Sequence, residues 1–402
     1  MMQKEYVESL LCELINSSNE FNRISVIERE LKNFEVKYNK ISIKRNIKKD
    51  YFFTENEDEF GKINIEARIN NNSSKTILLN THFDIVPSSM KMSIAKKRNG
   101  RIYGRGACDA LGQIVAILAT IRKLKENKEN KFINLIIQFV NCEETGGNGT
   151  LSLFIKKKEK IDYAIVFEPT NLELCGACRG ALWFTLEIYG VASHMGRFDE
   201  GDNAIYKMKY IVSSLEDYWN RLIKESKNHD YFKNYKFPIQ LNLGVINGGL
   251  INSSLPEKII LKGAVGFLSN KKISNIKNDL ERYIKKGVEN YKEKIKIKNF
   301  PQKDYKIFFN SLHNDPYDLK FSEKKKRVSI EEVIWRITGK ESVMKGFPAS
   351  CDARIIYLKN KIPTFVFGVG RLIEAHSENE FVNLKDIDKI IKILYSLFRN
   401  GK

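Results

Sequence analysis

Short apolar runs alternate with helical stretches along the first 170 residues, and this alternation constrains the fold more than any other feature. The runs that predict strands cover residues 77–79, 132–140 and 161–167, and the spacing of apolar residues predicts a helix over residues 114–124. Each predicted strand is followed closely by acidic residues or a histidine. Such alternation is typical of an α/β domain in which helices flank a largely parallel sheet.

The pattern changes after Arg179. The segments that follow predict a strand at 181–189, a helix at 203–222, strands at 240–245 and 258–267, and a helix at 273–291. We therefore expect a small α+β domain, residues 180–296, inserted into an α/β domain built from residues 1–179 and 297–402. That domain resumes with a helix at 330–337 and a strand at 363–367, and ends in a helix at 384–398.

Composition excludes several classes of protein. A chain of 402 residues with 42% hydrophobic and 29% charged residues predicts a soluble globular protein of two domains. No apolar run approaches the roughly 20 residues of a membrane-spanning helix, and the first residues show no signal-peptide core. Six scattered cysteines favour reduced thiols, although Cys175 and Cys178 form one C-x-x-C pair. We expect a cytoplasmic protein with no membrane partner.

The net charge of +19 raises the question of nucleic-acid binding. Lysine is abundant throughout the chain, however, together with asparagine and isoleucine. The densest basic runs lack the interleaved aromatic residues on which bases would stack. The charge therefore indicates a solvated surface, and we expect no nucleic-acid partner.

Potential metal ligands follow the predicted strands, at the edge where open α/β sheets place their sites. They are His82, Asp84, Asp109, Glu143, Glu144, Glu168 and His376. The chain has only five histidines, and two of them belong to this set. His82 and Asp84 would project to the same side of an extended strand. The adjacent carboxylates Glu143 and Glu144 are costly at the end of a buried strand unless positive charge neutralises them.

A two-metal hydrolase requires this set of groups. Each ion takes an imidazole and carboxylates, one carboxylate bridges both ions, and an open position holds water. A further carboxylate must accept the proton of the water and pass it to the leaving nitrogen.

Several motifs occur together in a characteristic order. They are Thr81-His82-Phe83-Asp84-Ile85-Val86-Pro87, Gly104-Arg105-Gly106-Ala107-Cys108-Asp109, Asn141-Cys142-Glu143-Glu144-Thr145-Gly146, Phe167-Glu168-Pro169-Thr170, Gly190-Val191-Ala192-Ser193-His194, Ser350-Cys351-Asp352-Ala353-Arg354, and Ala375-His376-Ser377-Glu378-Asn379-Glu380. With these motifs the chain resembles the acetylornithine deacetylase / succinyl-diaminopimelate desuccinylase family of dinuclear zinc hydrolases. That family also includes aminoacylases, dipeptidases and glutamate-releasing carboxypeptidases.

The resemblance implies two zinc ions per chain, although such ligands also accept cobalt or manganese. It assigns His82 and Glu168 to one ion, Glu144 and His376 to the other, and Asp109 as the bridge. Asp84 would orient the ring of His82, and Glu143 would be the general base. The residues alone leave open that Asp84 caps a turn, or that Glu143 and Glu144 exchange roles.

The inserted segment would be the lid and dimerisation domain of the family, which implies a homodimer. His194 would then reach the site of the neighbouring subunit and stabilise the developing oxyanion. The alternative is that His194 is an ordinary surface histidine.

Two departures from the family pattern stand out. Asp109 is followed by Ala110-Leu111-Gly112-Gln113 where relatives have Met-Lys-Gly-Gly, and Gly266 replaces a lid arginine that often binds the substrate carboxylate. Arg354 and Arg179 then become candidates for that contact, with Asn252 in the well-matched lid stretch as a further substrate-binding residue. The alternative for Arg354 is a structural pairing with Asp352 or a neighbouring carboxylate.

The leading hypothesis is a deacylase of N-acyl amino acids that resembles acetylornithine deacetylase. The alternative is a dipeptidase or carboxypeptidase that cleaves short peptides with the same metal centre. A non-catalytic binding relative is disfavoured because every proposed ligand and the proposed base are present.

Overall fold

The structure is a computed structural model that describes residues 2–127, 133–154, 160–309, 312–319, 324–341 and 343–400. The chain forms two compact units. The larger one consists of residues 1–178, 317–347 and 351–402, and the smaller one of residues 179–316 and 348–350. The second junction between the units, where the chain returns to the larger one, lies at residue 317, about 20 residues later than the sequence indicated. The reason is that two short strands beyond residue 297 pair with the sheet of the smaller unit.

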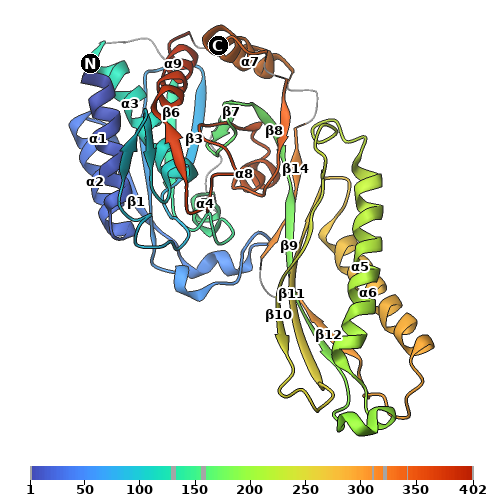
Figure 1. Ribbon diagram of the computed structural model, residues 1–402. Helices are drawn as coiled ribbons and strands as arrows, with labels where there is room; N and C mark the ends of the chain where they lie inside the picture. The colour runs from blue at the N-terminus through green and yellow to red at the C-terminus, as the bar shows by residue number, and fades with distance from the viewer. Residues whose placement is uncertain are drawn as a thin grey trace. The chain divides into compact units, whose positions relative to one another are not determined.

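A mixed sheet with a parallel centre forms the larger unit (Figure 1). Its strands run in the order β1-β2-β6-β3-β7-β16-β8-β14, with β15 paired to β8. The central strands β6, β3, β7 and β16 are mutually parallel, and the antiparallel pairs lie toward the two edges. The central bounds are β3 Thr76–His82, β6 Asn134–Val140, β7 Tyr163–Val166 and β16 Thr364–Val366. The predicted α/β class is confirmed.

Helices cover both faces of this sheet (Figure 1). The connection from β3 to its neighbour β6 contains α3 (Gly112–Glu126). The connection from β6 to β7 contains α4 (Asn148–Leu153) and crosses β3, so it runs along the sheet in the opposite direction. Since such crossovers are right-handed, α3 and α4 lie on opposite faces. Helices α1 (Met2–Asn16) and α9 (Leu384–Asn400) pack against α3, and α8 (Ala353–Asn360) packs against α4.

The remaining elements of the larger unit complete its edges. They are α2 Glu20–Asn33, β1 Lys37–Ser42, β2 Ile63–Ile69, β4 Lys96–Arg98, β5 Arg101–Tyr103, β8 Cys175–Cys178, β14 Tyr317–Asp318, α7 Lys324–Thr338, β15 Lys345–Phe347 and β17 Phe381–Asn383. Strands β17, β5 and β4 form a small separate sheet. All six cysteines are free.

The smaller unit is an antiparallel sheet with two long helices. Its strands are β9 Gly180–Tyr189, β10 Leu241–Gly248, β11 Lys258–Phe267, β12 Tyr305–Phe308 and β13 His313–Asn314, and its helices are α5 Ala204–Ser226 and α6 Ile273–Lys294. The order is β10-β11-β9-β12, and α5 packs on both α6 and the sheet. This is the predicted α+β insertion. Across the described residues of both units, no helix combines the length and apolar character needed to cross a membrane.

Candidate metal centre

Three adjacent strands place four of the predicted site residues at one edge of the sheet. His82 is the last residue of β3 and lies opposite Val140, the last residue of β6. Glu143 and Glu144 lie three and four residues beyond β6, and Glu168 lies two residues beyond β7 on the other side of β3. Because these strands are parallel, their carboxyl ends converge and bring the four side chains together.

Asp109 and His376 reach the same place from loops. Asp109 lies in the Ala107–Leu111 segment that precedes α3, and His376 lies in the loop after β16. One carboxylate oxygen of Asp109 is 3.1 Å from Nε2 of His82, and the other is 3.4 Å from Nε2 of His376. A single carboxylate therefore faces two imidazoles, which is the arrangement that a bridging ligand requires.

The potential ligands fall into two groups of three. His82, Glu143 and Glu168 form one group, and Asp109, Glu144 and His376 form the other, with the ligand atoms of each group within 4.8 Å of one another. Nε2 of His376 lies 3.1 Å from the Glu144 carboxylate. His82 is buried, whereas the His376 side chain is 49% exposed, so solvent can reach the cluster at His376.

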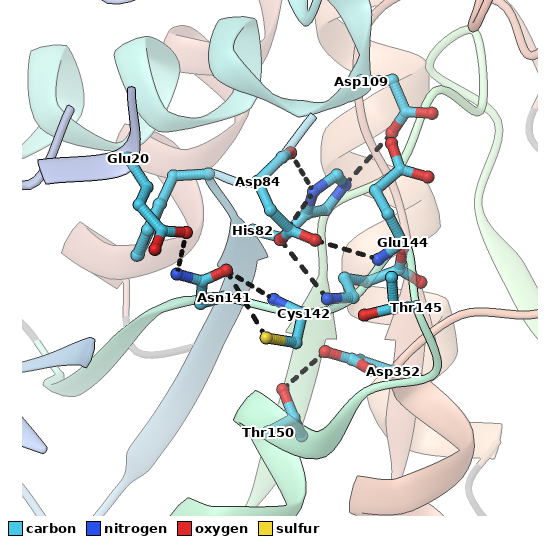
Figure 2. Close-up of polar contacts among 12 residues, drawn as sticks. Glu20, His82, Asp84, Asp109, Asn141, Cys142, Glu144, Thr145, Thr150 and Asp352 are labelled. Carbon is cyan, nitrogen blue, oxygen red and sulfur yellow. Dashed lines mark hydrogen bonds and ion pairs between the residues drawn. The ribbon is translucent and has the colours of Figure 1, made fainter. Parts of the chain in front are cut away.

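Asp84 supports the cluster in two ways (Figure 2). Nδ1 of His82 lies 3.0 Å from the backbone carbonyl of Asp84 and 3.5 Å from its carboxylate. A proton on Nδ1 leaves Nε2 of His82 free to bind a metal ion. The Asp84 carboxylate also accepts hydrogen bonds from the backbone N–H groups of Glu143 (3.3 Å) and Glu144 (3.1 Å). Asp84 thus links two strand ends that carry the cluster.

The buried carboxylates of the cluster need cations to neutralise their negative charge. Burial is the first cause that raises the pKa of both Glu143 and Glu168 well above the usual range, and neighbouring carboxylates add to it. Among the described residues, no group hydrogen-bonds Oε1 of Glu168, although this atom is buried. A buried carboxylate oxygen without a partner is costly. Imidazole nitrogens and carboxylate oxygens in this arrangement fit a pair of divalent metal ions.

Three further predicted site residues belong to the smaller unit. His194 and Asn252 are exposed residues of the smaller unit, and their loops are joined because the N–H of Met195 donates to the carbonyl of Ser253 (2.9 Å). Arg179, in the same unit, is buried, and its guanidinium donates to the carbonyls of Pro348 (3.0 Å) and Phe237 (2.8 Å).

A family model covers most of the chain. The model described as peptidase family M20/M25/M40 matches residues 78–400, which include both groups of potential ligands. The chain belongs to this family. It is therefore a hydrolytic metalloenzyme that acts on amide bonds, as members of the M20 family do.

Curated relatives support the same assignment. The chain is 29% identical over 338 residues to a succinyl-diaminopimelate desuccinylase of Wolbachia pipientis subsp. Culex pipiens, covering 79% of this chain and 77% of that protein. It is 26% identical to an acetylornithine deacetylase of Aliivibrio salmonicida, covering 85% of each chain. Among solved structures, a tripeptidase from Staphylococcus aureus superposes with a TM-score of 0.75 at 15% sequence identity. The superposition covers 99% of this chain and 98% of that chain, so the two proteins share a fold.

Residues before position 78, outside the match to the M20 family model, also support the site, and the sequence analysis did not identify them. The buried carboxylate of Glu59 accepts hydrogen bonds from the hydroxyl of Thr145 and from the amide of Asn148 (2.6 Å). The amide of Asn141 donates to Glu20 of α2 (2.7 Å; Figure 2). These contacts fix the loop that carries Glu143 and Glu144. Because the partners lie some 86 to 121 residues away in the chain, no local pattern could have revealed them.

Arg354 occupies a different environment from the one that the substrate-anchor hypothesis requires. Its side chain is only 1% exposed, and its guanidinium donates to the carbonyl of Gly146 (2.7 Å) in the loop after Glu144. This geometry favours the structural alternative.

We predict that Arg354→Ala lowers the free energy of unfolding by about 1.5–3 kcal/mol, the value of a hydrogen bond from a charged group. Hydrolysis of a free-acid substrate and of its matching amide should fall equally, which parallel kinetic assays can measure. Arg282→Ala removes an exposed arginine and serves as the control, with little change in stability expected. A rise in KM confined to the free acid would restore the anchor role.

Proposed function

We propose that the protein removes the acyl group from an N-acyl amino acid by hydrolysis of the amide bond, with a water molecule that two zinc ions would activate. The observation that carries this proposal is the position of Asp109, whose two carboxylate oxygens face the Nε2 atoms of His82 and His376. Asp109 forms one group of potential ligands with Glu144 and His376, and its contact with His82 connects this group to the second one.

The metal ligands in this proposal are divided as the resemblance implies. His82 and Glu168 would hold one ion, Glu144 and His376 would hold the other, and Asp109 would contribute a ligand to both. When bound, a zinc pair lowers the pKa of a water molecule and polarises the substrate carbonyl. The donor set also suits cobalt or manganese.

Glu143 is the proposed general base. It takes a proton from the attacking water and then gives that proton to the leaving nitrogen. Its carboxylate lies within 4.8 Å of the ligand atoms of His82 and Glu168, and burial raises its pKa. A raised pKa makes a carboxylate a stronger proton acceptor, as the first of these steps requires.

Deacylation is the preferred reaction because the two relatives named above carry a desuccinylase and a deacetylase name. Cleavage of a dipeptide or of a carboxyl-terminal residue remains the alternative, supported by the peptidase description of the family. We place the reaction in the cytoplasm, where the six free cysteines would stay reduced.

A substrate panel tests this choice. The zinc-loaded protein would be assayed against N-acetyl and N-succinyl amino acids and against dipeptides, with amine release as the readout. The proposal expects kcat/KM to be highest for an N-acyl amino acid. A clear preference for dipeptides would support the peptidase alternative, and no hydrolysis of any amide would contradict both.

We further propose that the protein is a homodimer assembled through the smaller unit, which would act as its lid. Strand β10 is at the end of its sheet, and within the described residues it pairs only with β11. Val245 and Ile246 on this strand are exposed, as is Leu250 just beyond it. An apolar edge strand of this kind can pair with a second copy of itself.

His194 is proposed to stabilise the oxyanion in the site of the partner subunit. Its Nδ1 accepts a hydrogen bond from the N–H of Gly196 (3.2 Å), which places the proton of the neutral ring on Nε2. The exposed Nε2–H is then a donor for a negatively charged oxygen.

Mixing His194→Ala protein with Glu143→Gln protein should therefore restore activity that neither variant has alone. One site of the mixed dimer contains both an intact Glu143 and an intact His194. Hydrolysis would be assayed after subunit exchange is verified with differently tagged chains, and each variant exchanged with itself serves as the control. Absence of rescue in verified mixed dimers would show that His194 does not act across subunits.

A further inference from the structure

A buried ion pair joins the two loops that carry Asp109 and His376. Nη1 of Arg105 lies 2.8 Å from Oε2 of Glu380, and the side chains are 3% and 0% exposed. The two residues are 275 positions apart in the sequence. The pairing of β17 with β5 brings them together, because Phe381 lies opposite Tyr103 in that register.

Each partner of the pair also holds the backbone of one potential ligand. Oε1 of Glu380 accepts hydrogen bonds from the backbone N–H groups of Cys108 (3.1 Å) and Asp109 (3.3 Å). Nη2 of Arg105 donates to the backbone carbonyl of His376 (3.2 Å). An uninterrupted chain of contacts therefore runs from Asp109 through Glu380 and Arg105 to His376.

Two features indicate that the pair has a task beyond holding the fold. Removing two charges from water costs several kcal/mol per ion, so a buried ion pair is weak evidence of a purely stabilising role. His376 also has a left-handed backbone with a φ of 62°, which a residue other than glycine keeps only where its surroundings impose it. The hydrogen bond from Arg105 to its carbonyl is one such constraint.

We infer that Arg105 and Glu380 are positioning residues that set the separation of Asp109 and His376 and so raise the affinity of the site for metal. This inference rests on the two-metal site proposed above and extends it to groups that contact neither metal nor substrate. The pair acts only through the backbones of Asp109 and His376. Its loss should weaken above all the ion held by Asp109, Glu144 and His376.

The test compares zinc binding by the full-length metal-free protein and by two variants, using isothermal titration calorimetry. Glu380→Gln keeps an acceptor for the two N–H groups but removes the charge that Arg105 faces. Arg105→Lys keeps a charge but cannot donate to Glu380 and to the His376 carbonyl with the same planar geometry. The affinity of one of the two zinc ions should fall about 10- to 100-fold in Glu380→Gln, as is typical when groups that support metal ligands are lost, and by less in Arg105→Lys.

Lys207→Met is the matched control. Lys207 forms a buried ion pair with Asp202 in the smaller unit, so this variant should lose stability without losing zinc affinity. Absorption spectra of the cobalt-loaded proteins add a readout of ligand geometry, which should change in Glu380→Gln and not in Lys207→Met. If Glu380→Gln does not fold, the zinc affinity of the milder variant Arg105→Lys tests the inference.

Equal zinc affinity in the wild type and in the folded variants would overturn the inference and leave the two-metal site intact. An equal loss of affinity in Lys207→Met would also overturn it, because stability alone would then explain the effect. A wild-type protein that binds no zinc would instead contradict the proposed function, and the inference with it.

Discussion

Replacement of Glu143 by glutamine is expected to lower kcat by at least about 10²–10⁴-fold, the range for loss of a general base. Glutamine has nearly the same shape but cannot take a proton from water. KM should change little, because Glu143 is proposed to act on the proton and not on substrate binding. Steady-state kinetics on an N-acyl amino acid, together with elemental analysis, would measure both effects.

The neighbouring carboxylate provides the matched control for this prediction. Glu144 lies 3.1 Å from Nε2 of His376 and is assigned as a metal ligand. Glu144→Gln should therefore lose metal, whereas Glu143→Gln should keep a normal metal content. The opposite pattern would show that the two glutamates have exchanged roles, and near-normal turnover in Glu143→Gln would mean that another group is the base.

Replacement of Asp109 by alanine is expected to have the second large effect, a lower affinity for both metal ions. Its carboxylate is the one group that faces both His82 and His376 among the described residues. Loss of metal-assisted stabilisation, worth several kcal/mol, corresponds to a decrease in kcat/KM of roughly 10³-fold or more.

The experiment compares Asp109→Ala with His376→Ala. Metal content after dialysis against trace zinc should fall for both ions in Asp109→Ala and mainly for one ion in His376→Ala. If Asp109→Ala kept one ion at wild-type affinity, the bridging assignment would be wrong.

The sequence predicted much of the fold and of the cluster because both depend on regular patterns. Apolar runs marked β3, β6 and β7, and parallel strands end at the same edge of a sheet, so His82, Glu143 and Glu168 were expected to converge. The sequence also grouped Asp109 and His376 with these residues, but the structure places both in loops, so the strand pattern alone did not explain how they reach the cluster.

Other features could not be predicted because they depend on contacts between distant segments. The short strands β12 and β13 carry little periodicity of their own, and their pairing with β9 moves the second junction to residue 317. The pairing of Arg105 with Glu380 depends on the register of β17 and β5. For Arg354, the charge suggested a substrate contact, whereas its burial follows from tertiary packing.

The zinc dependence of hydrolysis is the decisive test of the proposed two-metal site. Metal-free protein would be titrated with zinc while bound metal and hydrolysis of an N-acyl amino acid are followed in the same samples. Activity should be absent without metal, rise as zinc binds, and reach its plateau at two ions per chain. Full activity in the metal-free protein, or a protein that binds no zinc, would contradict it.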